Sequence, residues 1–144
     1  MYSILTGLIA LGSLFTTGSA TCYLGGQDGD NGARLRGIDG ITTACEALIG
    51  TYIPGESRHF CLQVNGTKWD FFLKCVSYST STIQLEECMN GMGKEAYGCR
   101  RGGYSNYWTW AYTADPNAGF CSGGWHPKVT WTRRAAPRTR RIED

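Results

Sequence analysis

The stretch HFCLQVNGTKWDFFLKC, residues 59–75, decides the fold that this sequence predicts. Asn65-Gly66 at its centre favours a two-residue hairpin turn, because both positions of that turn need a positive φ. The flanking strands then align so that their apolar residues face each other: Val64 pairs with Thr67, Leu62 with Trp69, and Phe60 with Phe71. We therefore expect an antiparallel hairpin with one continuous apolar face.

The opposite face of this hairpin also carries apolar groups, at Cys61 and Phe72. A sheet with apolar residues on both faces is usually covered on both sides. Helical patterns over residues 38–49 and 81–103 can provide the cover. The predicted fold class is therefore α+β: a small antiparallel sheet with helices on both faces, a helix/sheet/helix sandwich stapled by disulfides.

Both predicted helices show apolar residues at helical spacing. In the first these are Ile38, Ile41, Cys45, Leu48 and Ile49. In the second they are Leu85, Cys88, Met89, Met92, Ala96 and Cys99. Ser81 or Thr82 can cap the second helix, Arg100 and Arg101 suit its last turn, and Gly102-Gly103 end it.

The first twenty residues predict a secretory signal peptide. An apolar run from Ile4 to Phe15 is followed by Gly18 and Ala20 at the −3 and −1 positions of a cleavage site. The run is shorter than the ~20 apolar residues of a spanning helix, so we expect cleavage and no membrane span. The predicted organisation is a signal peptide over 1–20, one domain over 21–121 and a flexible basic extension over 122–144, in a secreted, extracellular protein.

All seven cysteines follow the proposed cleavage site, as expected for a protein that forms disulfides in an oxidising compartment. Six cysteines can pair, and the sequence alone leaves fifteen connectivities open. Because the number is odd, one thiol stays free or pairs with another chain. Asn65-Gly66-Thr67 is also an N-glycosylation sequon, and it coincides with the hairpin turn.

The formal net charge of +2 belongs to the C-terminal extension. Residues 21–121 carry eight Lys or Arg against ten Asp or Glu, whereas residues 122–144 carry six against two. Binding to nucleic-acid phosphates needs a positive face on the folded domain, so the charge distribution argues against a nucleic-acid partner. The extension is interpreted as solvated chain with two dibasic pairs, Arg133-Arg134 and Arg140-Arg141.

Neither a metal site nor a catalytic site is predicted. No two cysteines have the short separation of zinc ligands, and the acidic loop over 28–39 ends in Asp where a calcium loop has a bidentate Glu. Glu56, Arg58 and His59 resemble the acid, cation and imidazole of small secreted ribonucleases. Along one strand, however, His59 faces away from the other two. We expect no cofactor and a protein that is not an enzyme.

The stretch YWTWAYTADPNAGFC, residues 107–121, predicts a third strand. Trp108, Trp110 and Tyr112 alternate with small residues, which places the three rings on one side of a strand. The strand is expected to stop at a turn formed by Asp115-Pro116-Asn117. The rings are either part of the core or a platform for a ligand.

Cysteine order and the last motif complete a pattern: Cys22-Tyr23 after a signal peptide, Cys45 in a helix, Cys61 in a strand, Cys88 and Cys99-Arg100-Arg101-Gly102-Gly103 on a second helix, then Ala114-Asp115-Pro116-Asn117-Ala118-Gly119-Phe120-Cys121. Over residues 22–121 the chain resembles the small secreted fungal glycan-binding lectins typified by a mushroom inhibitor of tobacco mosaic virus. The resemblance implies a single-domain helix/sheet/helix sandwich that binds carbohydrate without a metal and without an enzymatic step.

The chain departs from the pattern of this family in three places. Cys75 is additional to the six shared cysteines, which makes it the candidate for a free thiol or for a bridge that forms a dimer. Ala111 and Thr113 stand where charged side chains are expected before the Ala-Asp-Pro-Asn motif. The extension after Cys121 has no counterpart in the family.

A glycan-binding site needs exposed aromatic faces and fixed polar groups, and both occur near the end of the aromatic strand. The predicted glycan-binding residues are Trp108, Trp110, Tyr112, Asp115 and Asn117, with Arg100 and Arg101. The predicted disulfide cysteines are Cys22, Cys45, Cys61, Cys88, Cys99 and Cys121, and Asn65 is the predicted glycosylation site. The expected partner is a carbohydrate on a glycoprotein or cell surface. The alternative is a secreted effector or toxin that acts on a host protein or through an unrecognised hydrolytic site.

Overall fold

The computed structural model describes residues 20–32, 40–64 and 66–122. The signal peptide predicted over 1–20 lies outside the described residues except for its last residue, and the extension does so after Ser122. The glycosylation site at Asn65 and the end of the acidic loop also lie outside them. Within the described part of the chain, no helix is long and apolar enough to cross a membrane.

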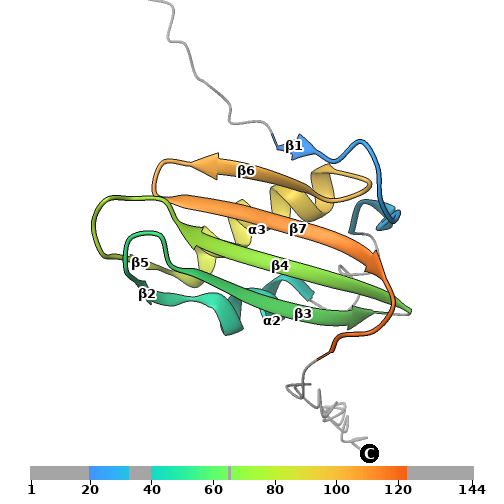
Figure 1. Cartoon of the computed structure of the whole chain (residues 1–144), viewed down its shortest axis with the longest axis horizontal. Coiled ribbons are helices and arrows are strands. Elements are labelled where there is room, and N and C mark those ends of the chain that lie inside the picture. Colours follow the sequence, from blue (N-terminus) through green and yellow to red (C-terminus); the bar gives the residue numbers. More distant parts are fainter. Residues whose placement is uncertain (1–19, 33–39, 65, 123–144) are drawn as a thin grey trace, which may run out of the picture.

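A five-stranded antiparallel sheet forms the body of the protein (Figure 1). Its strand order is β1-β6-β7-β4-β3. The strands are β1 (Thr21–Cys22), β3 (Ser57–Val64), β4 (Thr67–Cys75), β6 (Gly103–Tyr107) and β7 (Trp110–Ala118). Two further strands, β2 (Gly50–Tyr52) and β5 (Ser81–Ile83), pair antiparallel in a small second sheet.

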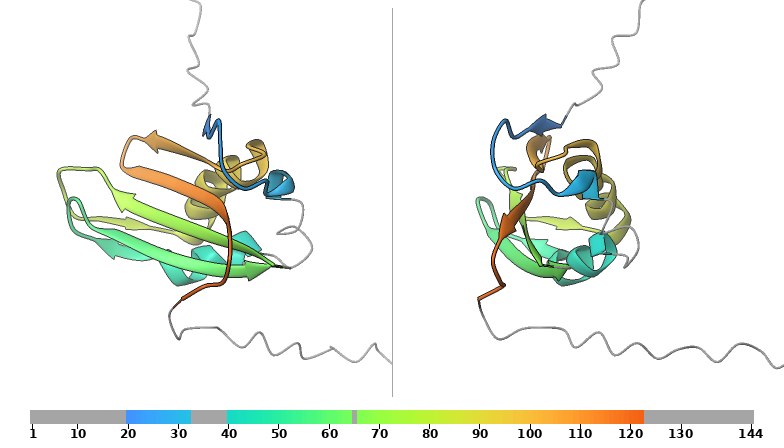
Figure 2. Two further views of the ribbon diagram at one scale, coloured as in Figure 1. Left: turned by 45° about the vertical axis from the view of Figure 1, so that its right-hand side comes forward. Right: turned by 90° about the vertical axis from the view of Figure 1, so that its right-hand side faces the viewer.

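The two α-helices among the described residues lie on the same face of the large sheet. They are α2 (Gly40–Leu48) and α3 (Leu85–Gly98), and a single 3-10 turn, η1, covers Asp30–Gly32. Figures 1 and 2 show the two α-helices on one side of the strands, and the disulfide Cys45–Cys88 joins them. No described element covers the opposite face of the sheet.

The predicted sandwich with helices on both faces is therefore wrong. The described part of the chain is mainly β, with seven strands in two antiparallel sheets and helices on one side of the large sheet. The prediction depended on the apolar residues Cys61 and Phe72, which do face away from the helices. Cys61 is bonded to Cys121, and Phe72 stacks on the ring of His59 with centroids 4.4 Å apart. Because these residues find local partners on a mostly polar face, no second helical layer is needed.

The predicted hairpin is confirmed in its register. β3 and β4 pair Val64 with Thr67, Leu62 with Trp69, and Phe60 with Phe71. The apolar side chains of this hairpin face the helices and are buried. Each large apolar side chain that is fully buried stabilises the fold by roughly 1.5–3 kcal/mol, so this face of the hairpin is central to the core.

The prediction of one helix over residues 81–103 is wrong. Residues 81–83 form β5, and α3 begins at Leu85 with Gln84 as its N-cap, so neither Ser81 nor Thr82 caps it. Thr82 is β-branched and suits a strand, and its hydroxyl lies 2.8 Å from the hydroxyl of Thr51 on β2. The helix ends at Gly98, so Arg100 and Arg101 follow it rather than occupy its last turn.

The strand β7 continues through the predicted turn at residues 115–117, so that prediction is also wrong. β7 begins at Trp110 and ends at Ala118. Proline lacks an N–H donor and is normally excluded from the middle of a sheet. Here the pairing of β6 with β7 ends at Ala114, so at Pro116 only β4 flanks β7. Pro116 therefore has no second strand to bond.

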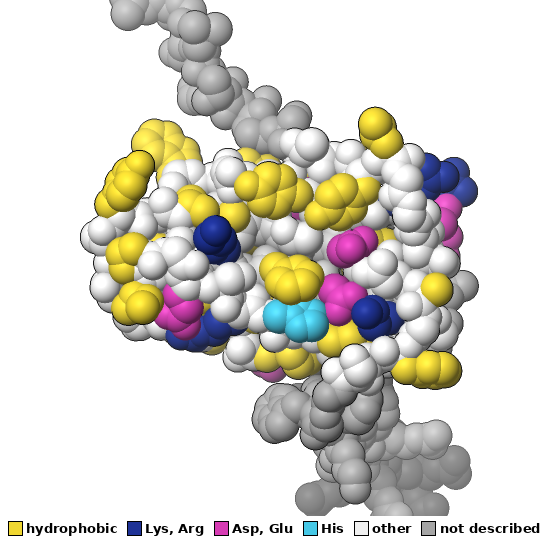
Figure 3. All heavy atoms as spheres, in the orientation of Figure 1, with side chains coloured by type: hydrophobic (Ala, Val, Ile, Leu, Met, Phe, Trp, Pro, Cys, Tyr) yellow, Lys and Arg dark blue, Asp and Glu magenta, His cyan; other side chains and the backbone are white. Residues whose placement is uncertain are grey.

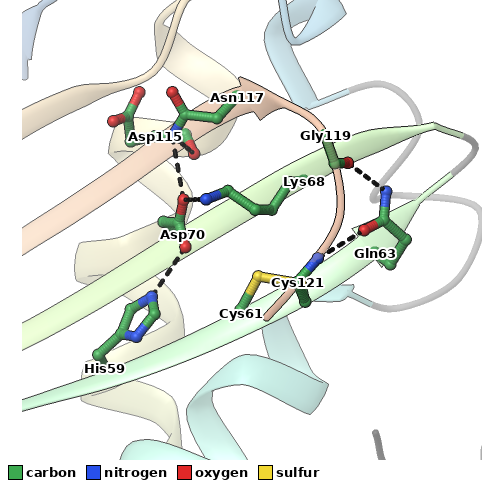
Figure 4. Close-up of polar contacts among 9 residues, drawn as sticks. All are labelled: His59, Cys61, Gln63, Lys68, Asp70, Asp115, Asn117, Gly119 and Cys121. Atoms are coloured by element: carbon green, nitrogen blue, oxygen red, sulfur yellow. Dashed lines mark hydrogen bonds and ion pairs between the residues drawn. A yellow bond between two sulfur atoms is a disulfide. The ribbon is translucent and has the colours of Figure 1, made fainter. Parts of the chain in front are cut away.

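Three disulfides connect the six cysteines that were predicted to pair. They are Cys22–Cys99, Cys45–Cys88 and Cys61–Cys121. The side chain of Gln63 further holds the chain after β7, because it donates to the carbonyl of Gly119 and accepts from the N–H of Cys121 (Figure 4).

Cys75 is the free thiol, as predicted, and it is fully buried. Its side chain lies on the core side of β4. A disulfide between two chains through Cys75 would therefore require β4 to leave the core.

Candidate functional site

The predicted glycan-binding residues do not form one site. They fall into four places: the core, the loop after β1, the tip of the β6–β7 hairpin and the uncovered face of the sheet. The last two places present side chains to a ligand.

Trp110 and Tyr112 face the helices and are buried. The ring of Trp110 contacts the ring of Tyr52 edge to face, with centroids 5.2 Å apart. The ring of Tyr112 packs on Gly91 of α3, where a Cβ atom would overlap it. Glycine at position 91 therefore permits the close approach of α3 to β7, and both rings belong mainly to the core.

Arg100 and Arg101 hold the loop that follows β1. Arg100 pairs with the carboxylate of Asp28, and Arg101 donates to the carbonyl of Leu24. Asp28 also accepts a hydrogen bond of 2.8 Å from the backbone N–H of Asp30. That bond, together with Arg100, lowers the pKa of Asp28. These charged groups serve the conformation of the loop.

The uncovered face of the sheet has the densest group of side chains suited to a ligand. We call it the open-face site and define it by Tyr23, His59, Asp70, Phe72, Tyr104, Thr113, Asp115 and Asn117. Figure 3 views this face and shows a histidine, acidic side chains and aromatic rings close together over the middle of the sheet. Two of the predicted glycan-binding residues, Asp115 and Asn117, belong to it.

Three rings of the open-face site surround Thr113. Phe72 on β4 and Tyr104 on β6 lie directly opposite Thr113, one on each side of β7. The phenol of Tyr23 interacts with the Thr113 side chain, and burial together with the charge of Asp115 raises the pKa of that phenol. Phe72, Tyr104 and Tyr23 are 39%, 40% and 37% exposed. The rings are thus walls around a polar floor.

Asp70 fixes the polar part of the open-face site. Its side chain is almost buried and accepts three hydrogen bonds (Figure 4). Nε2 of His59 lies 2.8 Å from Oδ1, while Nζ of Lys68 and Nδ2 of Asn117 each lie 3.0 Å from Oδ2. Burial alone would raise the pKa of Asp70, but these hydrogen bonds outweigh burial and lower it. Asp70 is therefore an ionised group that orients its three neighbours.

Asn117 and Asp115 provide hydrogen-bond acceptors beside the rings. The amide nitrogen of Asn117 donates to Asp70 and, at 3.3 Å, to the backbone carbonyl of Asp115. The amide oxygen of Asn117 consequently points away from Asp70, next to the carboxylate of Asp115 (Figure 4). Among the described residues, no side chain donates a hydrogen bond to the Asp115 carboxylate. Both acceptors are available to the hydroxyls of a ligand.

A second candidate site is a groove on the helix side of the sheet, at the tip of the β6–β7 hairpin. Its volume is about 720 Å³, within the range of small-molecule sites. We call it the tip groove. The polar part of its lining comes from α3 and the residue before it: Gln84, Glu86, Glu87, Asn90 and Lys94. The rings that line it are Tyr107, Trp108 and Tyr112.

Trp108 has the most unusual conformation in the tip groove. It is the first of two residues that connect β6 to β7, and its φ of 53° lies in the region that glycine favours. Its side chain is 99% exposed, so no packing compensates for the strain. The left-handed region costs an ordinary residue about 1–2 kcal/mol. Strain at an exposed aromatic residue makes Trp108 a candidate for binding a ligand.

The ribonuclease-like set does not assemble. Nε of Arg58 lies 2.8 Å from Oε1 of Glu56, and the guanidinium lies 3.9 Å from the centroid of the Tyr52 ring. His59 points to the uncovered face and contacts Asp70 instead. In the part of the chain that the structure describes, no three His, Cys, Asp or Glu side chains gather where they could hold a metal ion.

The fold and the two sites define a class: a small, disulfide-linked, mainly β protein with candidate ligand-binding side chains on an uncovered sheet face and in a groove. No protein-family model matches this chain, and no curated protein matches its sequence. Membership of the lectin family therefore stays a prediction.

Proposed function

We propose that the protein is a secreted carbohydrate-binding protein that needs no metal and catalyses no reaction, and that the open-face site binds the sugar. The observation that carries the proposal is the combination of partly exposed rings around Thr113 with the acceptor oxygens of Asn117, which Asp70 holds, and of Asp115. A sugar has apolar C–H faces and a rim of hydroxyls. It therefore needs a ring beside it and oriented polar groups at its edge, and the open-face site offers both.

Folding alone does not account for the rings. The uncovered face of an antiparallel sheet is normally polar, and contiguous exposed apolar surface on a soluble protein marks a binding site. Phe72 and Tyr104 lie opposite the same residue of β7, so their rings stand two strand spacings apart, roughly 10 Å. Tyr23 reaches Thr113 between them, so the three rings together offer one apolar surface against which a sugar can pack.

The polar groups of the open-face site are oriented before a ligand arrives. Asp70 holds the amide of Asn117 and the ring of His59 through hydrogen bonds of 3.0 and 2.8 Å. Ordering a side chain on binding costs about 0.5–1.5 kcal/mol, and a side chain that is already held avoids most of that cost. The hydrogen-bond network around Asp70 thus supports affinity as well as the fold.

The charges on this face favour a neutral sugar. The carboxylates of Asp70 and Asp115 are balanced by the ammonium groups of Lys68 and Lys74, which project from the same face of β4. A balanced face gives no long-range attraction to a phosphate or a sulfated glycan. We therefore propose a neutral glycan and no nucleic acid as the partner.

The disulfides support an extracellular location. Three bridges within one chain are typical of proteins that fold in an oxidising compartment. Together with the predicted signal peptide, they support secretion.

The test compares one tyrosine inside the open-face site with one outside it. Tyr104→Ala removes a wall of the open-face site, whereas Tyr78→Ala removes a fully exposed ring after β4, outside both candidate sites. Titration calorimetry against a neutral glycan that the wild-type chain retains should show affinity about ten-fold or more weaker for Tyr104→Ala, as is usual when an aromatic anchor is truncated. Tyr78→Ala should bind as the wild type does.

Equal affinities of the two variants would contradict the proposal. Asp115→Asn gives an independent check, since it keeps the shape of the side chain and removes its charge. A wild-type chain that binds no glycan but binds a protein from the surface of a host cell would favour the effector alternative instead.

A further inference from the structure

The tip groove differs from the open-face site in its charge. Its carboxylates, Glu86 and Glu87, are both exposed in the first turn of α3. Among the described residues, neither takes part in a salt bridge. The cation in its lining is Lys94, so two carboxylates face one ammonium group and the groove has a net negative charge. An unpaired carboxylate beside an exposed indole is a receptor for a positive charge.

We propose that the tip groove is a second carbohydrate site and that it takes a sugar with a protonated amine, such as a glucosamine unit of an oligosaccharide. The inference rests on the proposed function in one respect, the choice of carbohydrate as the ligand class. It goes beyond that function because it assigns a separate site, a different ligand charge and a second ligand for each chain.

The groove already holds an ammonium group on a ring. Nζ of Lys94 lies 4.4 Å from the centroid of the Tyr107 ring, which is the geometry of a cation–π contact. Indole attracts a cation more strongly than phenol does, and the ring of Trp108 is almost completely exposed. Lys94 already contacts the weaker of these two rings, Tyr107. The stronger one, Trp108, is therefore open to a cation from a ligand.

The helix terminus explains why the carboxylates are there but does not neutralise them. Acidic residues in the first turn of a helix are stabilised by the exposed N–H groups and the helix dipole. The outward oxygens of Glu86 and Glu87 still have no cationic partner among the residues that the structure describes. The amides of Gln84 and Asn90 lie in the same lining and can bond the hydroxyls of the sugar that carries the amine.

The two sites can be occupied at the same time. Tyr107 and Tyr112 face the helices, whereas Asp115 lies on the uncovered face. Asp115 is five residues beyond Trp110 along β7, about 17 Å at the rise of a strand. A single chain therefore presents two separate surfaces, one for a neutral sugar and one for an amine-bearing sugar.

The test uses two oligosaccharides of equal length that differ only at nitrogen: oligomers of glucosamine and of N-acetylglucosamine. Calorimetry of the full chain at neutral pH and low salt should show glucosamine oligomers bound roughly five-fold more tightly or better, since a cation–π contact and a nearby carboxylate each favour the ammonium form. Trp108→Gly should abolish the binding. Glu86→Gln combined with Glu87→Gln should remove the preference between the oligomers. Tyr78→Ala is the matched aromatic control and should change nothing.

Equal affinity for the two oligomers in the wild-type chain would overturn the inference. So would binding of glucosamine oligomers that is unchanged in Trp108→Gly but lost in Tyr104→Ala, because the amine would then occupy the open-face site. That second result would leave the proposed function standing. Conversely, Trp108-dependent binding of glucosamine oligomers without any binding of neutral glycans would support the tip groove and contradict the open-face proposal.

Discussion

Replacing Trp108 with glycine should make the folded protein more stable. Trp108 begins the two-residue connection between β6 and β7 with a φ of 53°, and hairpin turns with a positive φ at this position normally have glycine there. The side chain is 99% exposed, so its removal takes no apolar surface out of the core. What changes is the conformational energy of the backbone.

The size of the effect follows from two opposing terms. Relief of the left-handed strain is worth about 1–2 kcal/mol, because glycine has no Cβ to clash with the following carbonyl. The greater freedom of glycine in the unfolded chain offsets about 0.5–1 kcal/mol of this gain. At the midpoints of the two ranges the net stabilisation is about 0.75 kcal/mol, which for a domain of this size raises the unfolding temperature by roughly 3–6 °C.

Thermal unfolding followed by circular dichroism, with the disulfides intact, measures this shift. Trp108→Ala is the matched control, since alanine loses the indole but keeps a Cβ and therefore keeps the strain. Trp108→Gly should unfold at a higher temperature than both Trp108→Ala and the wild type. If the glycine variant is no more stable than the alanine variant, the strained turn is not a feature of the protein in solution.

Three further predictions concern the core. Glu95 is fully buried, and burial raises its pKa above the ordinary 4.5. Its contribution to stability is therefore complete below about pH 4.5 and declines as the pH rises toward the raised pKa. The free energy of unfolding in urea should decline less across this pH range in Glu95→Gln, and identical pH profiles of the two proteins would show that the Glu95 pKa is not raised. Gly91→Ala should destabilise the fold by about 1–3 kcal/mol, because the added Cβ overlaps the ring of Tyr112. Gly93→Ala in the same helix meets only ordinary contacts and should be neutral or stabilising. Equal urea midpoints for the two variants would contradict the close packing of α3 on Tyr112. Cys75 should not react with a thiol reagent until the protein unfolds, and the chain should run as a monomer on a non-reducing gel. Rapid labelling of Cys75, or a dimer that a reductant dissociates, would show that β4 opens.

The hairpin could be predicted from the sequence because its information is local. The turn at Asn65-Gly66 sets the register of β3 and β4, and alternation along each strand then assigns every side chain to a face. The second layer of helices was predicted wrongly. The prediction took Cys61 and Phe72 as an apolar face that helices would cover, whereas Cys61 is in a disulfide with Cys121 and Phe72 stacks on His59.

The end of the aromatic strand depended on a long-range feature. Pro116 predicts a turn by any local rule, but β7 tolerates it because β6 stops opposite Ala114. No pattern within residues 107–121 reveals where β6 stops. The disulfide connectivity was beyond prediction for the same reason, since many pairings fit one cysteine spacing.

The open-face site was only partly predictable. The hairpin register already places Phe72 opposite His59 and Asp70 opposite Cys61, so these residues could have been assigned to one face from the sequence. The position of β7 beside β4, which brings Asn117 to Asp70, has no local signal. The tip groove combines the start of α3 with the hairpin turn at Trp108, two segments that only the tertiary fold brings together.

The measurement that tests the account most directly is retention of the full secreted chain on a broad panel of immobilised neutral glycans at high salt, beside Tyr104→Ala and a chain that ends at Ser122. High salt suppresses attraction between the basic extension and anionic groups, so retention there reports on the folded domain. A defined set of neutral glycans should retain the wild-type and shortened chains, and Tyr104→Ala should lose this retention. Carbohydrate binding by the open-face site would be contradicted if the wild-type chain bound no glycan. It would also be contradicted if Tyr104→Ala were retained like the wild type and the shortened chain were not retained.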